Sequence, residues 1–247
     1  MSTRIIINQP DESKRLNAGD VKFLIIHYTA GDYQRAKYIF EHPLEFDQVS
    51  VQFVLDLDGT IDELIPTSSG ITYQANHCGA SYWMQEDEIL SGFNKFSIGV
   101  EIINPNGNLL DYTEQQYQSL LGLIKRLQEY YPNLRSASSI LGHEQIAGFR
   151  GKVDPGVKFN WSRVFSECYG LESFERRGVV CVPPALIAIF ESCLDLEPLA
   201  TNRDANVNFW RLISATMEMS MSLLANGQSL PMVEHACRRK IAELTPK

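Results

Sequence analysis

The sequence predicts an α/β domain followed by a smaller, all-helical region. Up to about residue 170, apolar runs of strand length alternate with polar stretches of helical periodicity, which is the pattern of α/β proteins. From Val182 onward the chain shows helical periodicity alone. With 247 residues the chain is long enough for one large domain and a small second one. We therefore expect a first domain over residues 1–172 and a helical domain of unknown role over residues 176–247.

Six short segments of the first domain carry the strand pattern. These segments are residues 4–7, 23–28, 51–57, 60–64, 97–103 and 139–141. The third and fourth flank Asp58 and Gly59, two residues that tolerate positive φ angles, so the sequence predicts a hairpin at this point.

The clearest helix follows Thr113. Thr113 and Gln116 fit a capping box, in which each side chain satisfies a backbone N–H of the first turn. Apolar residues then recur at helical spacing until Pro132 ends the segment. The other helices are expected over residues 33–42, 184–194, 206–225 and 231–244.

The composition indicates which partners and locations are to be expected. The net charge of −8 and the lack of a long basic run argue against nucleic acid or anionic lipid as the main partner. No stretch approaches the roughly 20 apolar residues that a membrane span needs. There is no visible signal peptide, and the five cysteines form no CxxC pair. We expect a cytoplasmic protein, with delivery outward by a signal-independent route as the alternative.

Five polar residues stand out against this background. His27 ends one apolar run, Glu101 interrupts another, and His143 is followed by Lys152 and Asp154. Two histidines and one aspartate suit a catalytic Zn²⁺ site, which keeps one coordination position open for water. Each residue alone has a structural alternative: a buried histidine bonded to the backbone, a bonded strand carboxylate, a surface lysine or an aspartate in a turn.

Five ordered blocks resemble the zinc-dependent N-acetylmuramoyl-L-alanine amidases of the AmpD-like, or type 2 amidase, family. The blocks are residues 23–29, 56–61, 77–83, 97–101 and 142–156. That family shares its fold with phage T7 lysozyme and the peptidoglycan recognition proteins, which implies a central mixed β-sheet flanked by helices. The family's enzymes hydrolyse the amide between the lactyl group of N-acetylmuramic acid, or its 1,6-anhydro form, and L-alanine of the peptidoglycan stem peptide. The helical region has no recognisable counterpart in the resemblance.

The resemblance implies a role for each of the five polar residues. His27, His143 and Asp154 would bind one Zn²⁺ per chain. Glu101 would take a proton from the attacking water and pass it to the departing amine. Lys152 would stabilise negative charge on the scissile carbonyl oxygen.

The resemblance also implies a wall for the substrate cleft, with some departures from the family pattern. His77, Ser81 and Trp83 would form this wall, with simple packing as an equal alternative. The interval from His143 to Asp154 is one residue longer than is common in the family, so residues 149–151 are expected to form an enlarged loop. Gln52 stands where many members carry a histidine, which places the proton transfer on Glu101.

Three further alternatives remain open at this stage. The substrate would be peptidoglycan or soluble muropeptides, unless the chain is a non-catalytic peptidoglycan-fragment binding module of the same fold. Zinc would be purely structural if a fourth ligand such as Cys78 completed its shell. The helical region could shield the cleft, bind a partner or mediate self-association.

Overall fold

A six-stranded mixed sheet forms the centre of the molecule. The computed structural model describes residues 3–5, 11–42, 49–85, 88–194 and 203–244. The strand order is β1-β5-β4-β9-β3-β10, and every neighbouring pair is parallel except β4 and β5. The strands are β1 (Thr3–Ile5), β3 (Phe23–Tyr28), β4 (Phe53–Leu55), β5 (Ile61–Glu63), β9 (Ser97–Ile102) and β10 (Ile140–Gly142). The predicted mixed sheet is thus confirmed, although β4 and β5 are shorter than expected and residues 6 and 7 lie outside the described part.

The predicted hairpin joins β4 to β5. The two strands pair antiparallel, and Gly59 adopts a φ of 84° in the turn. The backbone N–H of Asp56 donates to the carbonyl of Thr60 at 2.9 Å and closes the turn. A glycine suits this position because residues with a side chain rarely adopt positive φ.

Four more strands form two small sheets that the sequence pattern did not reveal. The pairs are β2 (Arg15–Asn17) with β6 (Ile71–Tyr73) and β7 (Tyr82–Gln85) with β8 (Glu88–Ser91). With three or four residues each, these strands are too short for a reliable alternation of apolar and polar side chains.

Helices cover both faces of the central sheet. They are α1 (Tyr33–Glu41), α2 (Glu114–Tyr130), α3 (His143–Ala147) and α4 (Trp161–Tyr169). The capping box of α2 is confirmed, since Gln116 N donates to Thr113 Oγ1 at 3.1 Å and Thr113 N donates to Gln116 Oε1 at 3.0 Å. The sequence analysis did not predict α3 or α4, and the five residues of α3 are too few to show helical periodicity.

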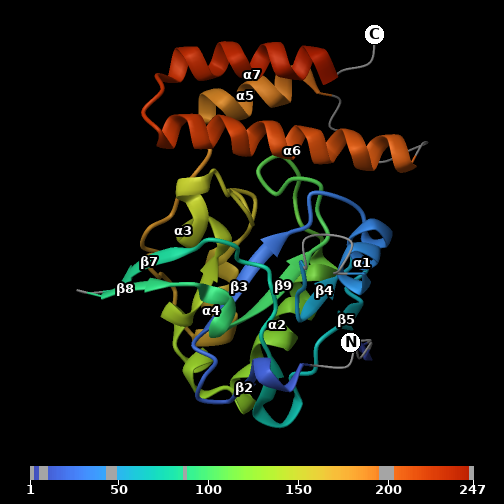
Figure 1. Cartoon of the computed structure of the whole chain (residues 1–247), viewed down its shortest axis with the longest axis vertical. Coiled ribbons are helices and arrows are strands. Elements are labelled where there is room, and N and C mark those ends of the chain that lie inside the picture. The colour runs from blue at the N-terminus through green and yellow to red at the C-terminus, as the bar shows by residue number, and fades with distance from the viewer. Residues whose placement is uncertain (1–2, 6–10, 43–48, 86–87, 195–202, 245–247) are drawn as a thin grey trace.

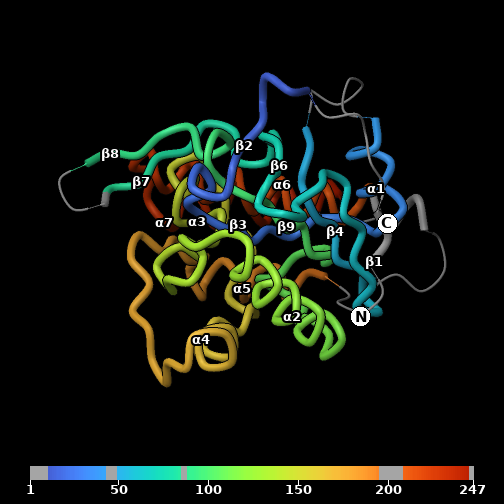
Figure 2. The backbone as a smooth tube through the Cα atoms, turned by 90° about the horizontal axis from the view of Figure 1, so that it is seen from below, coloured from blue at the N-terminus to red at the C-terminus, as the bar shows by residue number. Residues whose placement is uncertain are grey.

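Side-chain alternation along β3 separates two hydrophobic cores. Leu24 and Ile26 belong to the core under α2 and α4, which lie together on one side of the sheet (Figure 2). Phe23 and Ile25 belong to a second core on the opposite face, together with Ile146 of α3. His27 follows Ile25 by two positions and therefore points to this second face.

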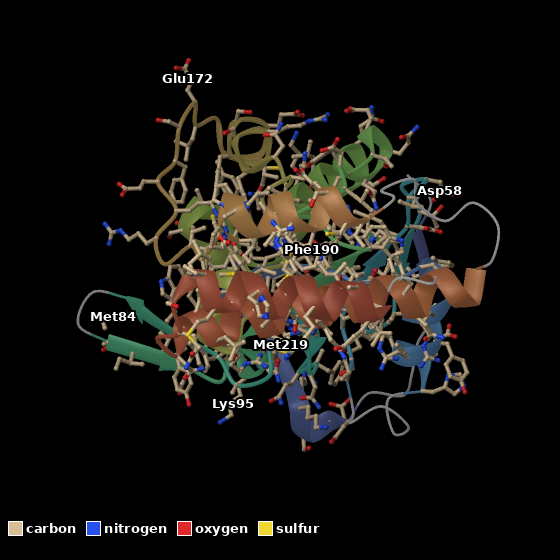
Figure 3. All side chains as sticks on the ribbon, turned by 90° about the horizontal axis from the view of Figure 1, so that it is seen from above. Asp58, Met84, Lys95, Glu172, Phe190 and Met219 are labelled. Atoms are coloured by element: carbon tan, nitrogen blue, oxygen red, sulfur yellow. The ribbon has the colours of Figure 1, made fainter. Side chains whose placement is uncertain are left out.

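The C-terminal region consists of three helices at one end of the molecule (Figure 1). They are α5 (Pro184–Cys193), α6 (Arg203–Ala225) and α7 (Leu230–Leu244). Phe190, labelled in Figure 3, belongs to α5 and is fully buried. The core of this bundle also contains Leu109 and Val153 from earlier in the chain. The helices therefore pack directly on the segment that carries Lys152 and Asp154. Of the helices in the described part of the chain, none has both the length and the apolarity for a bilayer crossing.

Candidate active site

Sheet register places His27 beside Glu101. The two residues are paired positions of the parallel strands β3 and β9. In β9, Ile98, Val100 and Ile102 belong to the core under α2, so Glu101 points to the opposite face, as His27 does. An imidazole and a carboxylate from distant segments are thus held side by side by backbone hydrogen bonds.

His143 reaches the same place directly after the edge strand β10, and Asp154 reaches it from the segment after α3. β10 pairs with β3, and His143 is the first residue of α3, directly after β10. The segment that carries Asp154 returns to α3, where the backbone N–H of Glu144 donates to the carbonyl of Asp154 at 3.0 Å. The end of β10 and this backbone bond together place both side chains next to His27.

Two imidazoles converge on one carboxylate oxygen. Nδ1 of His27 lies 2.9 Å from Asp154 Oδ2, and Nδ1 of His143 lies 3.0 Å from the same oxygen. All three side chains are buried. Their candidate ligand atoms lie within 4.8 Å of one another, which makes them a possible metal-binding group.

The other ring nitrogens of the two histidines are held in place by neighbours. His27 Nε2 lies 2.9 Å from His77 Nδ1, and His143 Nε2 lies 3.1 Å from the carbonyl oxygen of Cys78. The ring of His77 packs over Gly99, where a β-carbon would lie 2.7 Å from His77 Nδ1. Such outer contacts orient the rings and leave the Nδ1 atoms facing Asp154, as in metal sites whose ligands are fixed by second partners.

Burial sets the charge states of these groups. Burial and the neighbouring His143 lower the pKa of His27 to about 4, so its ring is neutral at pH 7. Burial opposes ionisation of Asp154, yet the electrostatic attraction of His143 and the hydrogen bonds of both rings hold the pKa of its carboxyl well below the usual range. A neutral imidazole beside an ionised carboxylate is the donor set that Zn²⁺ prefers.

Unsatisfied carboxylate oxygens support the fit of a cation. Asp154 Oδ1 and Glu101 Oε2 are buried and have no hydrogen-bond partner among the described residues. A buried, unpaired carboxylate oxygen is costly, and a metal or an ordered water would remove that cost. His27, His143 and Asp154 therefore fit a bound divalent cation, with Glu101 beside it.

Cys78 offers a second possible ligand group, with His27 and His77. Its thiol is fully buried, and burial raises its pKa far above the ordinary value. Because metals bind the thiolate rather than the thiol, this group suits a cation less well than the set containing Asp154.

Glu101 has the environment of a proton carrier. Burial, followed by the negative charge of Asp154, raises the pKa of its carboxyl well above the usual range. A raised pKa makes a carboxylate a stronger proton acceptor than an ordinary glutamate, which is what a general base needs.

Lys152 is paired with a residue of the C-terminal region. Its Nζ donates to both carboxylate oxygens of Glu218 on α6, at 2.8 and 2.9 Å. Burial acts against the charged amine, but the carboxylates of Glu218 and Asp154 outweigh it and raise the pKa of Lys152. The ammonium is therefore retained at pH 7.

The five residues singled out in the sequence line one cleft of about 820 Å³. This volume suits a small molecule or a peptide fragment. The cleft also includes residues that the sequence gave no reason to choose, among them Arg150 in the loop and Arg211 and Glu218 on α6. Charged residues on a helix are usually solvated, so only the packing of α6 reveals them.

Of the three residues expected to form the cleft wall, only His77 lies at the cleft. His77 lines the cleft and contacts His27. Ser81 is buried and accepts a hydrogen bond from Phe93 N at 3.0 Å, and Trp83 packs against Phe23 with ring centroids 5.6 Å apart. Neither Ser81 nor Trp83 lines the cleft, so their geometry is that of packing.

The two departures from the family pattern have local structural solutions. Gln52 is fully buried and bridges two backbones, accepting from Gly99 N at 2.8 Å and donating to the carbonyl of Tyr73 at 2.9 Å. Residues 148–150 form a 3₁₀ turn, and Arg150 donates to the carbonyls of Cys78 and Ala80 at 2.8 Å each. The longer interval between His143 and Asp154 is thus anchored, through Arg150, to residues 78–80.

Comparison with known proteins identifies a family for this chain. Residues 17–157, more than half of the chain, match the sequence profile of the N-acetylmuramoyl-L-alanine amidases. The 1,6-anhydro-N-acetylmuramyl-L-alanine amidase AmpD of Escherichia coli strain K12 is 34% identical over 116 residues, which are 47% of this chain and 56% of AmpD. The chain thus matches little more than half the length of that relative.

Two solved structures share the fold. AmpDh3 of Pseudomonas aeruginosa has a TM-score of 0.53 at 23% identity, covering 97% of this chain and 98% of AmpDh3. AmiD of Escherichia coli, solved with the substrate anhydro-N-acetylmuramic acid-L-Ala-D-γ-Glu-L-Lys, has a TM-score of 0.52 at 21% identity, covering 91% of this chain and 89% of AmiD. This likeness concerns the fold, and its coverage extends into the C-terminal helices, for which the sequence indicated no counterpart. With the profile match over residues 17–157, it follows that the chain belongs to the N-acetylmuramoyl-L-alanine amidase family.

Proposed function

We propose that the chain is a zinc-dependent N-acetylmuramoyl-L-alanine amidase. It hydrolyses the amide between the lactyl group of N-acetylmuramic acid, or of its 1,6-anhydro form, and L-alanine of the stem peptide. The observation that carries the proposal is the convergence of His27 and His143 on Asp154, with Glu101 on the neighbouring strand. Family membership supports the reaction type.

His27, His143 and Asp154 are the residues that would hold the metal, one ion per chain. When bound, Zn²⁺ supplies Lewis acidity and lowers the pKa of water to about 7. The protein's own contribution is to keep both Nδ1 atoms and the aspartate oxygen within reach of one point before the metal arrives. His77 and the carbonyl of Cys78 maintain that arrangement through the far side of each ring.

Glu101 carries the proton in the proposed reaction. Its unpartnered Oε2 accepts the proton of the attacking water and later transfers it to the nitrogen of the departing L-alanine. The raised pKa suits the first step, because a more acidic carboxyl would accept the proton of the water poorly, and the protonated Glu101 is then the donor for the amine.

Lys152 supplies positive charge beside the reacting carbonyl. An ammonium has three N–H donors, and Glu218 occupies two of them. The third is available to the carbonyl oxygen as it gains negative charge, and the loss of one such donor typically costs about 10²–10³ in kcat.

The form of the substrate is proposed to be a soluble 1,6-anhydro-muropeptide. The AmpD relative is named for that substrate, and AmiD was solved with an anhydro-N-acetylmuramic acid tripeptide. Release of stem peptide is to be measured from soluble anhydro-muropeptides and from intact sacculi in parallel. Faster release from sacculi would assign the enzyme to the polymer instead.

Glu101→Gln tests the mechanism directly. Because the amide cannot accept the proton, we expect kcat to fall by about 10²–10⁴ while zinc stays near one per chain. Glu63→Gln is the matched control: Glu63 is a buried strand carboxylate outside the cleft, bonded to Thr67 and Arg126. Full activity of Glu101→Gln would refute the mechanism. Muropeptide binding without hydrolysis by the zinc-loaded wild type would identify a non-catalytic binding module.

A further inference from the structure

Helix α6 forms one wall of the active-site cleft. Arg211 and Glu218 line the same cleft as His27, Glu101 and Asp154. The two α6 residues are seven positions apart, which is two helical turns, so they share one face of the helix. In Figure 1, α6 lies over the end of the sheet toward which β3 points. The C-terminal region is therefore present at the reaction site itself.

The contact between Glu218 and Lys152 has the geometry of a positioning pair. Nζ of Lys152 donates to both carboxylate oxygens, at 2.8 and 2.9 Å. The two side chains are only 28% and 27% exposed, so the pair is held partly out of water. A lysine has four flexible side-chain bonds, and a two-point contact to a fixed carboxylate removes most of that freedom.

Glu218 is itself held by tight packing of α6 on the first domain. A β-carbon on Gly151, the residue before Lys152, would lie 2.1 Å from the backbone oxygen of Glu218. One turn earlier on α6, Ser214 Oγ donates to the carbonyl of Pro105 at 2.8 Å and accepts from Asn106 Nδ2 at 3.0 Å. Ser214 and Asn106 are both buried. These contacts hold the part of α6 that carries Glu218 next to Lys152.

We propose that Glu218 of α6 is a positioning residue that holds the Lys152 ammonium at the cleft, so that the C-terminal region completes the active site. This inference rests on the proposed amidase function, in which Lys152 stabilises charge on the carbonyl oxygen. Glu218 acts through Lys152 and need not touch the substrate.

Kinetics of Glu218 variants test the proposal in the full-length, zinc-loaded chain. In Glu218→Ala and Glu218→Gln, Lys152 loses a charged partner, and we expect kcat to fall about tenfold while KM stays within about twofold. Glu243→Gln is the control: it breaks an exposed ion pair of the same region, Lys240 to Glu243 at 3.1 Å, and should leave both constants unchanged. The shape-conserving Gln variant keeps the test valid if the Ala variant folds poorly.

A double-mutant cycle separates positioning from a general structural effect. If Glu218 acts only through Lys152, Glu218→Ala should cause no further loss of kcat in a Lys152→Ala background. An equal loss in both backgrounds would overturn the proposal, as would wild-type kcat in both single Glu218 variants. A rise in kcat would also overturn it, because Glu218 would then withhold Lys152 from the substrate.

Chemical labelling of Lys152 provides a readout that does not depend on activity. Acetic anhydride acetylates free amines, and peptide mass spectrometry measures the rate at each lysine. We expect Lys152 to be labelled at least about three times faster in Glu218→Gln than in the wild type, and at the wild-type rate in Glu243→Gln. An unchanged rate in Glu218→Gln would overturn the proposal. A chain without amidase activity would instead refute the proposed function, and labelling still decides whether Glu218 holds Lys152.

Discussion

The cleft has two walls of different construction. The sheet wall carries His27, Glu101, His143 and Asp154, which are placed by strand register, the start of α3 and backbone hydrogen bonds. The helix wall carries Glu218, which is placed by the packing of α6 on a glycine. The sheet wall therefore fixes these four side chains relative to one another, whereas the helix wall holds Lys152 through Glu218.

Loss of a ligand on the sheet wall should have the largest effect. Asp154→Ala removes the oxygen that both Nδ1 atoms face, and we expect zinc content near zero and a fall in kcat/KM of more than about 10³. The measurements are metal analysis after dialysis and release of stem peptide. Wild type stripped by a chelator and reloaded with Zn²⁺ should regain activity, whereas the variant should not. Full zinc content in Asp154→Ala would exclude it as a ligand.

The difference between the walls explains what could be predicted from the sequence. His27 and Glu101 were recognisable because a charged or polar residue at an inward position of a strand is rare without a reason. Glu218 was not, because a glutamate on an amphipathic helix is ordinarily solvated. Its role depends on which helix face packs on Gly151, and local periodicity carries no information on that choice.

The positions of Ser81 and Trp83 show a second limit. The order of a motif along the chain indicates that its residues are close in space, but not which of them face the cleft. The face is decided by the antiparallel pairing of β7 and β8 and by the packing of Trp83 on Phe23. Neither contact leaves a periodic signal in the sequence.

Gly151→Ala tests whether the junction between the walls matters for stability. Gly151 has a φ of 87°, and its β-carbon would lie 2.1 Å from the backbone oxygen of Glu218, so α6 or the loop must shift. We expect the free energy of unfolding to fall by about 2–4 kcal/mol, together with a lower kcat. Urea denaturation and steady-state kinetics provide the measurements.

Gly170→Ala is the matched control for that substitution. Gly170 also has a positive φ, 68°, but nothing lies within 4 Å of the position of its β-carbon. Its substitution should cost only the backbone strain, about 1 kcal/mol, without a change in kcat. Equal losses of stability in the two variants would mean that the close approach of α6 contributes nothing beyond backbone conformation.

The smallest expected effect concerns a buried charge behind the sheet wall. Glu144 is buried in α3 and contacts Arg176 at 2.5 Å, but burial outweighs that attraction and raises the pKa of its carboxyl to about 7. The folded chain thus holds a proton that the unfolded chain releases near pH 4.5. Stability should therefore fall as the pH rises from about 4.5 to 7, by about 1–3 kcal/mol at most from this group.

Glu144→Gln should remove that fall, as measured by urea denaturation across the pH range. Glu114 serves as a control of opposite sign, because hydrogen bonds from Arg163 and Gln118 lower its pKa to about 2. Its contribution is present above pH 4.5 and is lost as the pH falls toward 2, so Glu114→Gln should leave the slope between pH 4.5 and 7 unchanged. If the free energy of unfolding varies with pH in the same way in wild type and Glu144→Gln, Arg176 keeps Glu144 ionised. The two residues would then form a true buried ion pair next to His143.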